Sequence, residues 1–416
     1  MTLAGPLSST TAGPQAAGYR AEGDARTGHG PVTGAVAPAA RPAALPLTVA
    51  DRAAALRDRL FASPVFQRWA ARLPVVRTVA RGRARAVFDL VAGFAYSQTA
   101  AACVQTGLLT MLAEGPLDEA TLVERLALPP DGAARLLCAA AALKLVERRS
   151  HGRWGLGVVG GPLLASPGLA QMIEHNALLY EELRDPVAHL RRAPGEGSAL
   201  AEYWPYVDAP RRASLGAADV SGYSALMTAT LPPLADELLD AVPLAERRTL
   251  LDVGGGEGAF VVAAARRHPH LACTLFDLPP VAARARRRLA EAGLGERVRA
   301  AGGDFDRDPL PGGADVATLV RVCLDHDDAT VSALLGRVRD ALAPGGMVVV
   351  AEPFAGVRGA EAVGDVYFAY YLRAMGRGRA RRADELRALL QGAGFRRVRV
   401  RPTRYPVVAG VITGEV

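Results

Sequence analysis

The chain has 416 residues, half of them hydrophobic, and a formal net charge of +7. This length predicts about two to three domains with a sizeable buried core. The basic residues are almost all arginine, with Lys144 the only lysine, which is typical of a GC-rich genome and argues against a nucleic-acid-binding function. The mildly basic charge is compatible with contact between one face of the protein and anionic lipid.

The four cysteines form neither a CxxC pair nor a metal-ligand pattern with histidine; they are Cys103, Cys138, Cys273 and Cys323. We expect buried thiols in a reducing compartment and no metal site. The N-terminal residues lack the charged and apolar segments of a signal peptide. No window holds the roughly 18 consecutive apolar residues of a membrane span. The sequence therefore predicts a soluble, cytoplasmic protein.

The N-terminal part is predicted to be a tail followed by a helical domain. Residues 1–48 are rich in Ala, Gly, Pro, Ser and Thr, which predicts disorder. Residues 49–165 are predicted to be helical and include a long, largely apolar segment over residues 87–115 that ends at Gly115. A second helix is capped by Asp118 and a third by Asp131, and a hairpin turns around residues 150–152.

This order of three helices and a hairpin is typical of a winged helix. The third helix carries only Arg135 and Lys144, too few polar side chains to read a DNA groove. The long helix is apolar on most faces, which indicates burial against a partner. We therefore interpret residues 49–165 as a dimerisation domain and expect no nucleic-acid partner.

Residues 166–245 are predicted to be a helical substrate-binding or linker region. Over residues 246–416, strand and helix patterns alternate, which predicts a mostly parallel sheet with crossover helices. The last two strand patterns, over 396–403 and 405–412, predict an antiparallel pair at the edge. The predicted fold class is thus α/β, with a C-terminal Rossmann-like domain behind an N-terminal α-helical winged-helix domain.

The stretch "LLDVGGGEGAF" over residues 250–260 joins an apolar strand to a helix expected to begin near Glu257. Asp252 leads the glycines Gly254, Gly256 and Gly258 in a D-x-G-x-G-x-G pattern, which differs from the dinucleotide pattern G-x-G-x-x-G. Glycines let a backbone pass close to a ligand, and a helix N-terminus offers N–H groups to a carboxylate. We expect a ligand-binding loop here.

Polar residues also follow the next two strands. Asp277 ends the second strand, where a carboxylate can accept hydrogen bonds from both hydroxyls of a ribose. Asp304 and Phe305 end the third strand, and an acidic residue beside an aromatic ring suits an adenine. Three such matches at consecutive strand ends predict a nucleoside-containing ligand.

With these motifs the chain resembles the S-adenosylmethionine-dependent O-methyltransferases that carry a winged-helix dimerisation domain. Within that group it is most similar to the hydroxyneurosporene (demethylspheroidene) O-methyltransferase branch of purple photosynthetic bacteria. The similar stretches are "LFASPVFQRWAARLP", "FDLVAGFAYSQTAAACV", "MIEHNALLYEELRDPVAHLRR", "YSALM" and "VRVCLDHDD". The resemblance covers about residue 48 to the end.

The resemblance implies methylation of the tertiary hydroxyl at the end of an acyclic carotenoid, in carotenoid biosynthesis for photosynthesis. It also implies an intertwined homodimer and leaves room for peripheral contact with the inner or photosynthetic membrane during substrate access. The methionine end of S-adenosylmethionine is expected by Gly254 and Gly256, behind Asp252. Asp277 is expected at the ribose. Asp304 and Phe305 are expected at the adenine, and Arg321 is also expected among the cofactor-binding residues.

The loop "VRVCLDHDD" over residues 320–328 departs from the wider family, where it resembles L-H-D-W-x-D and its histidine is the base for phenols. Aligned through the shared aspartates, Leu324 takes the place of that histidine and His326 takes the aromatic place. Asp325 is expected to be a structural cap. Glu352 matches one of the two acidic residues around the family histidine, and the second, near Ala380, is missing.

Two interpretations of the proton step follow. In the first, His326 or His175 takes the proton. In the second, no dedicated base exists, since a histidine of ordinary pKa near 6.5 cannot ionise a tertiary alcohol in advance. Catalysis would then come from alignment, which is worth about 7–11 kcal/mol in well-oriented reactions.

The acceptor pocket is expected to be apolar, with aromatic side chains of the stretch 365–376 near the reacting end: Tyr367, Phe368, Tyr370 and Tyr371. The alternative functions are O-methylation of a phenolic polyketide and C-methylation of a bacteriochlorophyll precursor. The weakly basic third helix disfavours a DNA-binding regulator, and the glycine pattern disfavours an NAD-dependent oxidoreductase.

Overall fold

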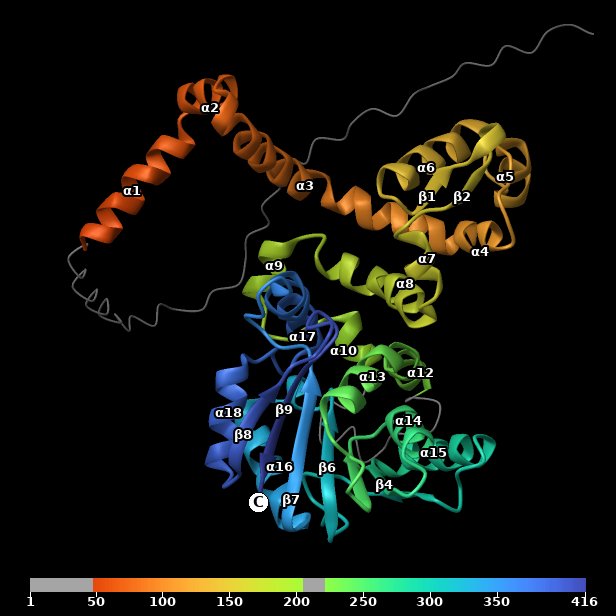
Figure 1. Ribbon diagram of the computed structural model, residues 1–416, viewed down its shortest axis with the longest axis vertical. Coiled ribbons are helices and arrows are strands. Elements are labelled where there is room, and N and C mark those ends of the chain that lie inside the picture. The colour runs from red at the N-terminus through yellow and green to blue at the C-terminus, as the bar shows by residue number, and fades with distance from the viewer. Residues whose placement is uncertain (1–47, 205–220) are drawn as a thin grey trace, which may run out of the picture. The chain divides into compact units, whose positions relative to one another are not determined.

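The computed structural model describes residues 48–204 and 221–416 (Figure 1). The predicted disorder of residues 1–48 thus falls almost entirely outside the described residues. The chain divides into two compact units, residues 1–84 and residues 85–416, and each is described by itself below.

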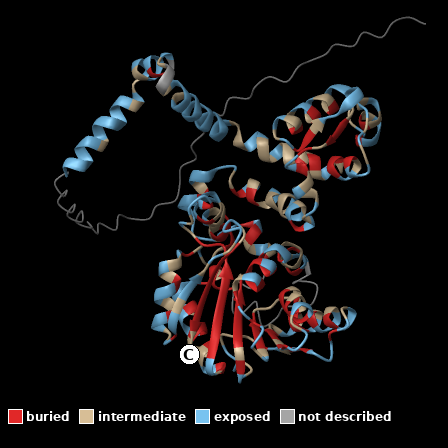
Figure 2. Cartoon of the chain, viewed as in Figure 1, coloured by how far each residue is buried: buried red, intermediate tan, exposed pale blue. Residues whose placement is uncertain are grey.

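The described part of the first unit is helical. It contains α1 (Val49–Ala62), α2 (Pro64–Arg72) and the beginning of α3 (Pro74–Gln105). Thr48 and Asp51 form a capping box that begins α1, and the Ser63 side chain caps α2 with Pro64 at the first helical position. No residue of α1 is buried, and Figure 2 shows its surface as exposed.

One helix, over Val76–Gln105, is long and apolar enough to cross a membrane by length and composition alone. Only 11% of its apolar window is buried. The sequence expectation concerned a run of about 18 consecutive apolar residues, and Asp89, Ser97 and Gln98 interrupt such a run here. The helix meets a different criterion, mean hydropathy, which tolerates these polar residues.

The second unit begins with a small helical domain. After α3 it contains α4 (Leu108–Ala113), α5 (Glu119–Leu126), α6 (Pro130–Ala142), β1 (Val146–Arg148) and β2 (Trp154–Leu156), with a 3-10 turn over Ser150–Gly152. The two strands pair antiparallel, as the hairpin prediction required. Leu108, Leu122, Leu137 and Trp154 are fully or nearly fully buried in its core.

Three expectations for this domain are wrong in detail. The apolar segment is broken at Gly107, whose φ of +68° ends α3 before α4 begins, because only glycine adopts that backbone conformation without strain. Pro129, not Asp131, is the N-cap residue of α6, and Asp131 pairs with Arg135 one turn on. Cys138 is exposed, because it lies on the outer face of α6.

Short helices lead from this domain to the sheet: α7 (Gly160–Leu164), α8 (Pro167–Glu182), α9 (Pro186–Arg191), α10 (Ala199–Tyr203), α12 (Ser221–Thr230) and α13 (Pro232–Ala241). Helix α8 packs against α12 and α17 (Phe368–Met375), which brings the helical region over the carboxyl ends of the strands. A π-helical turn over Ala362–Tyr367 precedes α17.

A seven-stranded sheet forms the C-terminal domain, with strand order β5-β4-β3-β6-β7-β9-β8. The strands are β3 (Thr249–Val253), β4 (Ala272–Asp277), β5 (Val298–Gly302), β6 (Ala314–Val320), β7 (Leu342–Glu352), β8 (Arg396–Arg401) and β9 (Gly410–Glu415). The first five are parallel and β9 runs antiparallel to β7 and β8. The α/β fold prediction is confirmed.

Helices α14 (Ala259–Arg267), α15 (Pro279–Glu291), α16 (Asp328–Ala341) and α18 (Ala383–Gly392) cover the sheet, whose central strands are buried (Figure 2). Two boundaries differ from the prediction. Helix α14 begins at Ala259 because Gly258 has a left-handed φ of +84°. The last strand begins at Gly410, after a turn, and with β8 it forms the antiparallel pair at the edge of the sheet that the sequence predicted.

Candidate functional site

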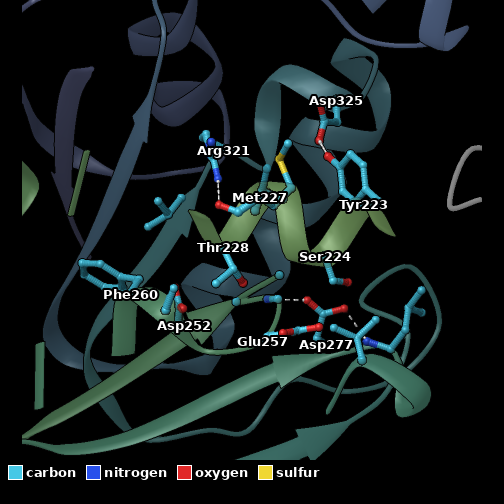
Figure 3. A pocket seen from close by; sticks show the side chains of 18 of the residues that line it. Tyr223, Ser224, Met227, Thr228, Asp252, Glu257, Phe260, Asp277, Arg321 and Asp325 are labelled. Carbon is cyan, nitrogen blue, oxygen red and sulfur yellow. Dashed lines mark hydrogen bonds between the residues drawn. The ribbon is translucent and has the colours of Figure 1, made fainter. Parts of the chain in front are cut away.

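A cavity lies at the carboxyl ends of β3, β4 and β6, where the strand order of the sheet reverses direction (Figure 3). Ligands of open α/β sheets bind at this position. All seven residues predicted to bind the cofactor line it: Asp252, Gly254, Gly256, Asp277, Asp304, Phe305 and Arg321. Of the three catalytic candidates, His326 lines this cavity, whereas His175 and Glu352 are not among its lining residues.

The glycine loop passes close to its surroundings, as the motif predicted. Gly254 has a φ of +69°, and a Cβ built on it would lie 2.8 Å from the Val322 side chain. Gly256 has a φ of +59° and open space on the side where a side chain would stand. The loop therefore offers a narrow cradle of backbone N–H groups that any larger residue would fill or strain.

Asp252 stands at the end of β3 with no exposed surface. Its Oδ1 accepts a hydrogen bond of 2.6 Å from the Thr318 hydroxyl, while its buried Oδ2 has no hydrogen-bond partner among the described residues. Burial, and secondarily the charge of Asp277, raises the pKa of Asp252 to about 7. A buried carboxylate oxygen without a donor favours a cationic or N–H-bearing group of a ligand at this point.

Asp277 is held by backbone groups on both oxygens. Gly256 N–H donates to Oδ2 at 2.8 Å, and Leu278 N–H donates to Oδ1 at 2.7 Å. Burial raises the pKa of Asp277 to about 6, although these two hydrogen bonds lower it. Asp277 lines the cavity (Figure 3), and each of its oxygens can accept a second hydrogen bond, so the carboxylate can accept from a pair of hydroxyl donors.

Asp304 and Phe305 also line the cavity. The Asp306 N–H donates to Asp304 Oδ1 at 2.9 Å, which orients that carboxylate. The Phe305 ring meets the His326 ring edge to face, with 5.3 Å between centroids, and the Trp204 ring lies 6.5 Å from the same histidine. His326 thus stands with the residues predicted for the adenine.

Arg321 ties the end of β6 to α12. Its guanidinium donates to Thr230 Oγ1 at 2.8 Å and to the Met227 carbonyl at 2.5 Å, and its backbone has a left-handed φ of +55°. Burial lowers the pKa of Arg321, although the nearby Tyr223 and Asp325 oppose that shift. The arginine places a positive charge on the cavity wall beside Asp325.

Asp325 also faces the cavity, and the expectation that it is a cap is wrong. Asp327 is the residue that caps α16, accepting from Thr330 N–H at 2.8 Å. The Asp325 Oδ2 accepts a long hydrogen bond of 3.5 Å from the Tyr223 hydroxyl (Figure 3). Burial raises the pKa of Asp325 to about 7, opposed by the charge of Arg321. This places a carboxylate that titrates near neutrality on the cavity wall.

Leu324, in the place of the family histidine, is buried and packs in an apolar cluster that includes Tyr371 and Met375. Its N–H donates to Glu352 Oε2 at 3.0 Å. Glu352 has no exposed surface, and burial raises its pKa to about 8. In this geometry Glu352 supports the backbone of the loop.

Sequence reasoning missed the residue that frames this loop. Arg381 is fully buried and donates at 2.6 Å to the carbonyls of Cys323 and His326, and at 2.8 Å to Asp328 Oδ1. The second acidic residue around the family histidine was expected near Ala380, and the sequence has none there. Arg381, one position later, organises the loop instead. Its role left no sign in the sequence, because the surrounding stretch contains many other arginines.

His175 belongs to a second cluster, on α8. Its Nε2 lies 3.0 Å from the Tyr371 hydroxyl and its ring lies 4.8 Å from the Tyr203 ring. Burial lowers the pKa of His175. Tyr367 donates to Asn176 Oδ1 at 3.0 Å in the same cluster. The aromatic residues predicted for the acceptor pocket gather here, beside Leu324, except for Tyr370, which faces His189 at 6.1 Å.

Among the residues that the structure describes, no group of three or more His, Cys, Asp or Glu side chains is placed to hold a metal ion.

Comparisons with known proteins agree with this geometry. Residues 216–396 match the O-methyltransferase domain family, and residues 88–166 match the O-methyltransferase dimerisation domain family. A protein of Cereibacter sphaeroides named demethylspheroidene O-methyltransferase is 44% identical over 359 residues, which cover 85% of this chain and 93% of that protein. A protein of Rhodobacter capsulatus with the same name is 41% identical over 83% of this chain and 85% of its own length.

Among solved structures, human N-acetylserotonin methyltransferase in complex with SAM superposes with a TM-score of 0.66 and 25% identity. The match covers 80% of this chain and 97% of the human one.

Proposed function

The chain belongs to the O-methyltransferase family, and we propose that this S-adenosylmethionine-dependent enzyme methylates the terminal tertiary hydroxyl of an acyclic carotenoid of the hydroxyneurosporene or demethylspheroidene type. The names of two relatives that align over most of the chain support this acceptor. The observation that carries the proposal in the structure is Leu324. A buried leucine stands in the place of the base used for phenols, beside an aromatic and apolar cluster suited to a hydrocarbon.

The residues present fit S-adenosylmethionine, which supplies an electrophilic sulfonium methyl group when bound. The buried Asp252 Oδ2 needs a donor, and an ammonium group meets that need. The two oxygens of Asp277 are oriented to accept from a ribose diol, and Phe305 offers a flat face to a purine. We assign the cofactor to Asp252, Gly254, Gly256 and Asp277 on one side of the cavity, and to Asp304 and Phe305 on the other.

The structure sharpens the question of the proton. Glu352 binds the backbone of the loop, His326 packs against Phe305, and His175 lies in the second cluster. Asp325 is the acidic group on the cavity wall that stands next to Leu324, with Tyr223 as its donor and Arg321 as its counter-charge. We assign Asp325 as the acceptor of the hydroxyl proton.

The chemistry of Asp325 suits an alcohol. A carboxylate of pKa about 7 cannot remove a proton from a free tertiary alcohol, but that proton becomes strongly acidic as the oxygen forms its new bond to carbon. The carboxylate then receives it late in the reaction, and Arg321 stabilises the ionised form beforehand. Alignment of the hydroxyl with the sulfonium methyl group supplies the remaining rate acceleration.

The acceptor can be tested with the purified full-length protein and S-adenosylmethionine labelled in its methyl group. We expect label in a hydroxylated acyclic carotenoid dispersed in detergent. Label in a phenolic polyketide or a bacteriochlorophyll precursor, with none in the carotenoid, would contradict the proposal.

We also propose a homodimer formed through the dimerisation domain. Large apolar side chains on α3 are exposed where the family match begins: Val87, Phe88, Leu90, Val91 and Phe94. Burial against a second copy would remove this apolar surface from water. Light scattering of the purified protein tests the dimer. We further propose that the enzyme contacts the inner or photosynthetic membrane peripherally, because a carotenoid dissolves in lipid.

A further inference from the structure

We propose that residues 48–84, called the basic arm below, dock on the surface of an anionic lipid bilayer. The inference deepens the proposed function, since it names the partner that would give access to a lipid-dissolved substrate. It rests on charge, on the arrangement of exposed side chains along α1, and on an exposed tryptophan in α2.

The charge of the chain is concentrated in the basic arm. Eight arginines and two aspartates give residues 48–84 a formal charge of +6, against +7 for all 416 residues. The remaining residues are therefore nearly neutral in sum. A cluster of this size next to lipid is attracted to anionic headgroups.

Helix α1 carries the pattern of a helix that lies in a membrane interface. Because successive residues of an α-helix are turned by about 100°, four apolar residues share one stripe: Val49, Ala53, Leu56 and Leu60. The large ones are exposed, Val49 to 84%, Leu56 to 71% and Leu60 to 46%.

The charges of α1 are ordered around this stripe. By the same helical geometry, arginines flank it on both sides, Arg57 on one and Arg52 and Arg59 on the other. The two acidic residues, Asp51 and Asp58, lie on the opposite face. Flanking arginines can reach the headgroups while their stems lie on the hydrocarbon, and the acids point away from the lipid.

Helix α2 continues the pattern. Val65 and Trp69 lie one turn apart and are exposed to 66% and 55%. The rings of Phe61, Phe66 and Trp69 pack in series with 5.9 Å between neighbouring centroids, which links the two helices. A tryptophan with its ring held in this way suits the level of the lipid headgroups.

A second copy of the chain fits the basic arm less well than lipid does. Two arms of charge +6 would repel each other, and they carry only two acidic residues each to offset this. The dimerisation match begins at residue 88, after the basic arm. The arm is thus complementary to an anionic surface.

The test is co-sedimentation of the full-length protein with vesicles of phosphatidylcholine alone or mixed with phosphatidylglycerol. We expect binding to the mixed vesicles only, weakening as salt is added. The variant Leu56→Glu/Leu60→Glu should bind the mixed vesicles at least about tenfold more weakly than the unmodified protein. The matched control Val158→Glu/Val187→Glu, which changes two exposed valines of the second unit, should bind like the unmodified protein.

Two results would overturn the proposal. One is equal binding of the Leu56→Glu/Leu60→Glu variant and the unmodified protein to the mixed vesicles. The other is conversion of that variant to a monomer in light scattering, which would assign the stripe to a second copy. Methyl transfer to detergent-dispersed carotenoid should be unchanged in both variants. If the unmodified protein fails that assay, the proposed substrate fails, while the vesicle result still decides the docking surface.

Discussion

The two sides of the cavity are built differently. On the cofactor side, the turns that follow β3 and β4 hold Asp277 by backbone N–H groups, one on each oxygen. On the acceptor side, the loop over residues 323–328 is held by side chains from distant parts of the chain, Glu352 and Arg381. A site fixed by local backbone can be recognised in a short motif, whereas a site fixed by distant side chains cannot.

The largest expected effect is on the cofactor side. If Asp277 accepts from both ribose hydroxyls as proposed, Asp277→Ala removes two charge-assisted hydrogen bonds, each worth about 1.5–3 kcal/mol. The dissociation constant of S-adenosylhomocysteine should therefore rise by about 10²–10⁴, measured by isothermal titration calorimetry. Asp306→Ala is the matched control and should bind normally. Unchanged affinity in Asp277→Ala would remove this residue from the cofactor site.

On the acceptor side, Arg381→Met tests whether one buried cation frames the loop. The change removes the buried guanidinium and its hydrogen bonds to two carbonyls and to Asp328, so the free energy of unfolding should fall by about 3–5 kcal/mol in urea titrations. Arg379→Met, which removes an exposed ion pair with Asp328, should cost less than about 1 kcal/mol. Similar losses in both variants would show that burial of Arg381 has no special role.

Glu352 should give the protein a measurable pH dependence of stability. Its pKa is raised from 4.5 to about 8 in the folded chain. Its contribution to stability is therefore fully present below the ordinary pKa and is lost as the pH rises through about 8. The Tm should fall between about pH 5 and pH 8 and level off at higher pH, and Glu352→Gln should flatten that fall. Identical slopes in the two proteins would mean that Glu352 does not titrate in this range.

The smallest effect is expected from His326→Ala. The main-chain carbonyl that accepts from Arg381 remains in the variant, and the lost ring packs against Phe305. We expect a loss of less than about tenfold in kcat and a modest rise in the KM for S-adenosylmethionine. A loss of several orders of magnitude in kcat, with folding preserved, would restore a histidine mechanism.

The sequence predicted the sheet, and the residues that it proposed for the cofactor line one cavity, because glycines and carboxylates at strand ends have a fixed relation to the fold. It placed Asp325 wrongly, since the capping role belongs to Asp327 two residues later and only the turn geometry separates them. It missed the contacts that Tyr223 and Arg381 make with the same loop from sequence positions about 100 and 55 residues away. Contacts of that kind leave no periodic or local signal in one sequence.

The most direct test of the account is the dependence of kcat on pH in the unmodified enzyme and in Asp325→Asn, with a hydroxylated acyclic carotenoid as the acceptor. The account predicts that kcat rises as the pH passes through about 7, where Asp325 ionises. Asp325→Asn should lose that rise and about 10²–10⁴ in kcat while binding S-adenosylhomocysteine normally. An Asp325→Asn enzyme with the rate and pH profile of the unmodified one would contradict the account and leave alignment alone as the source of catalysis.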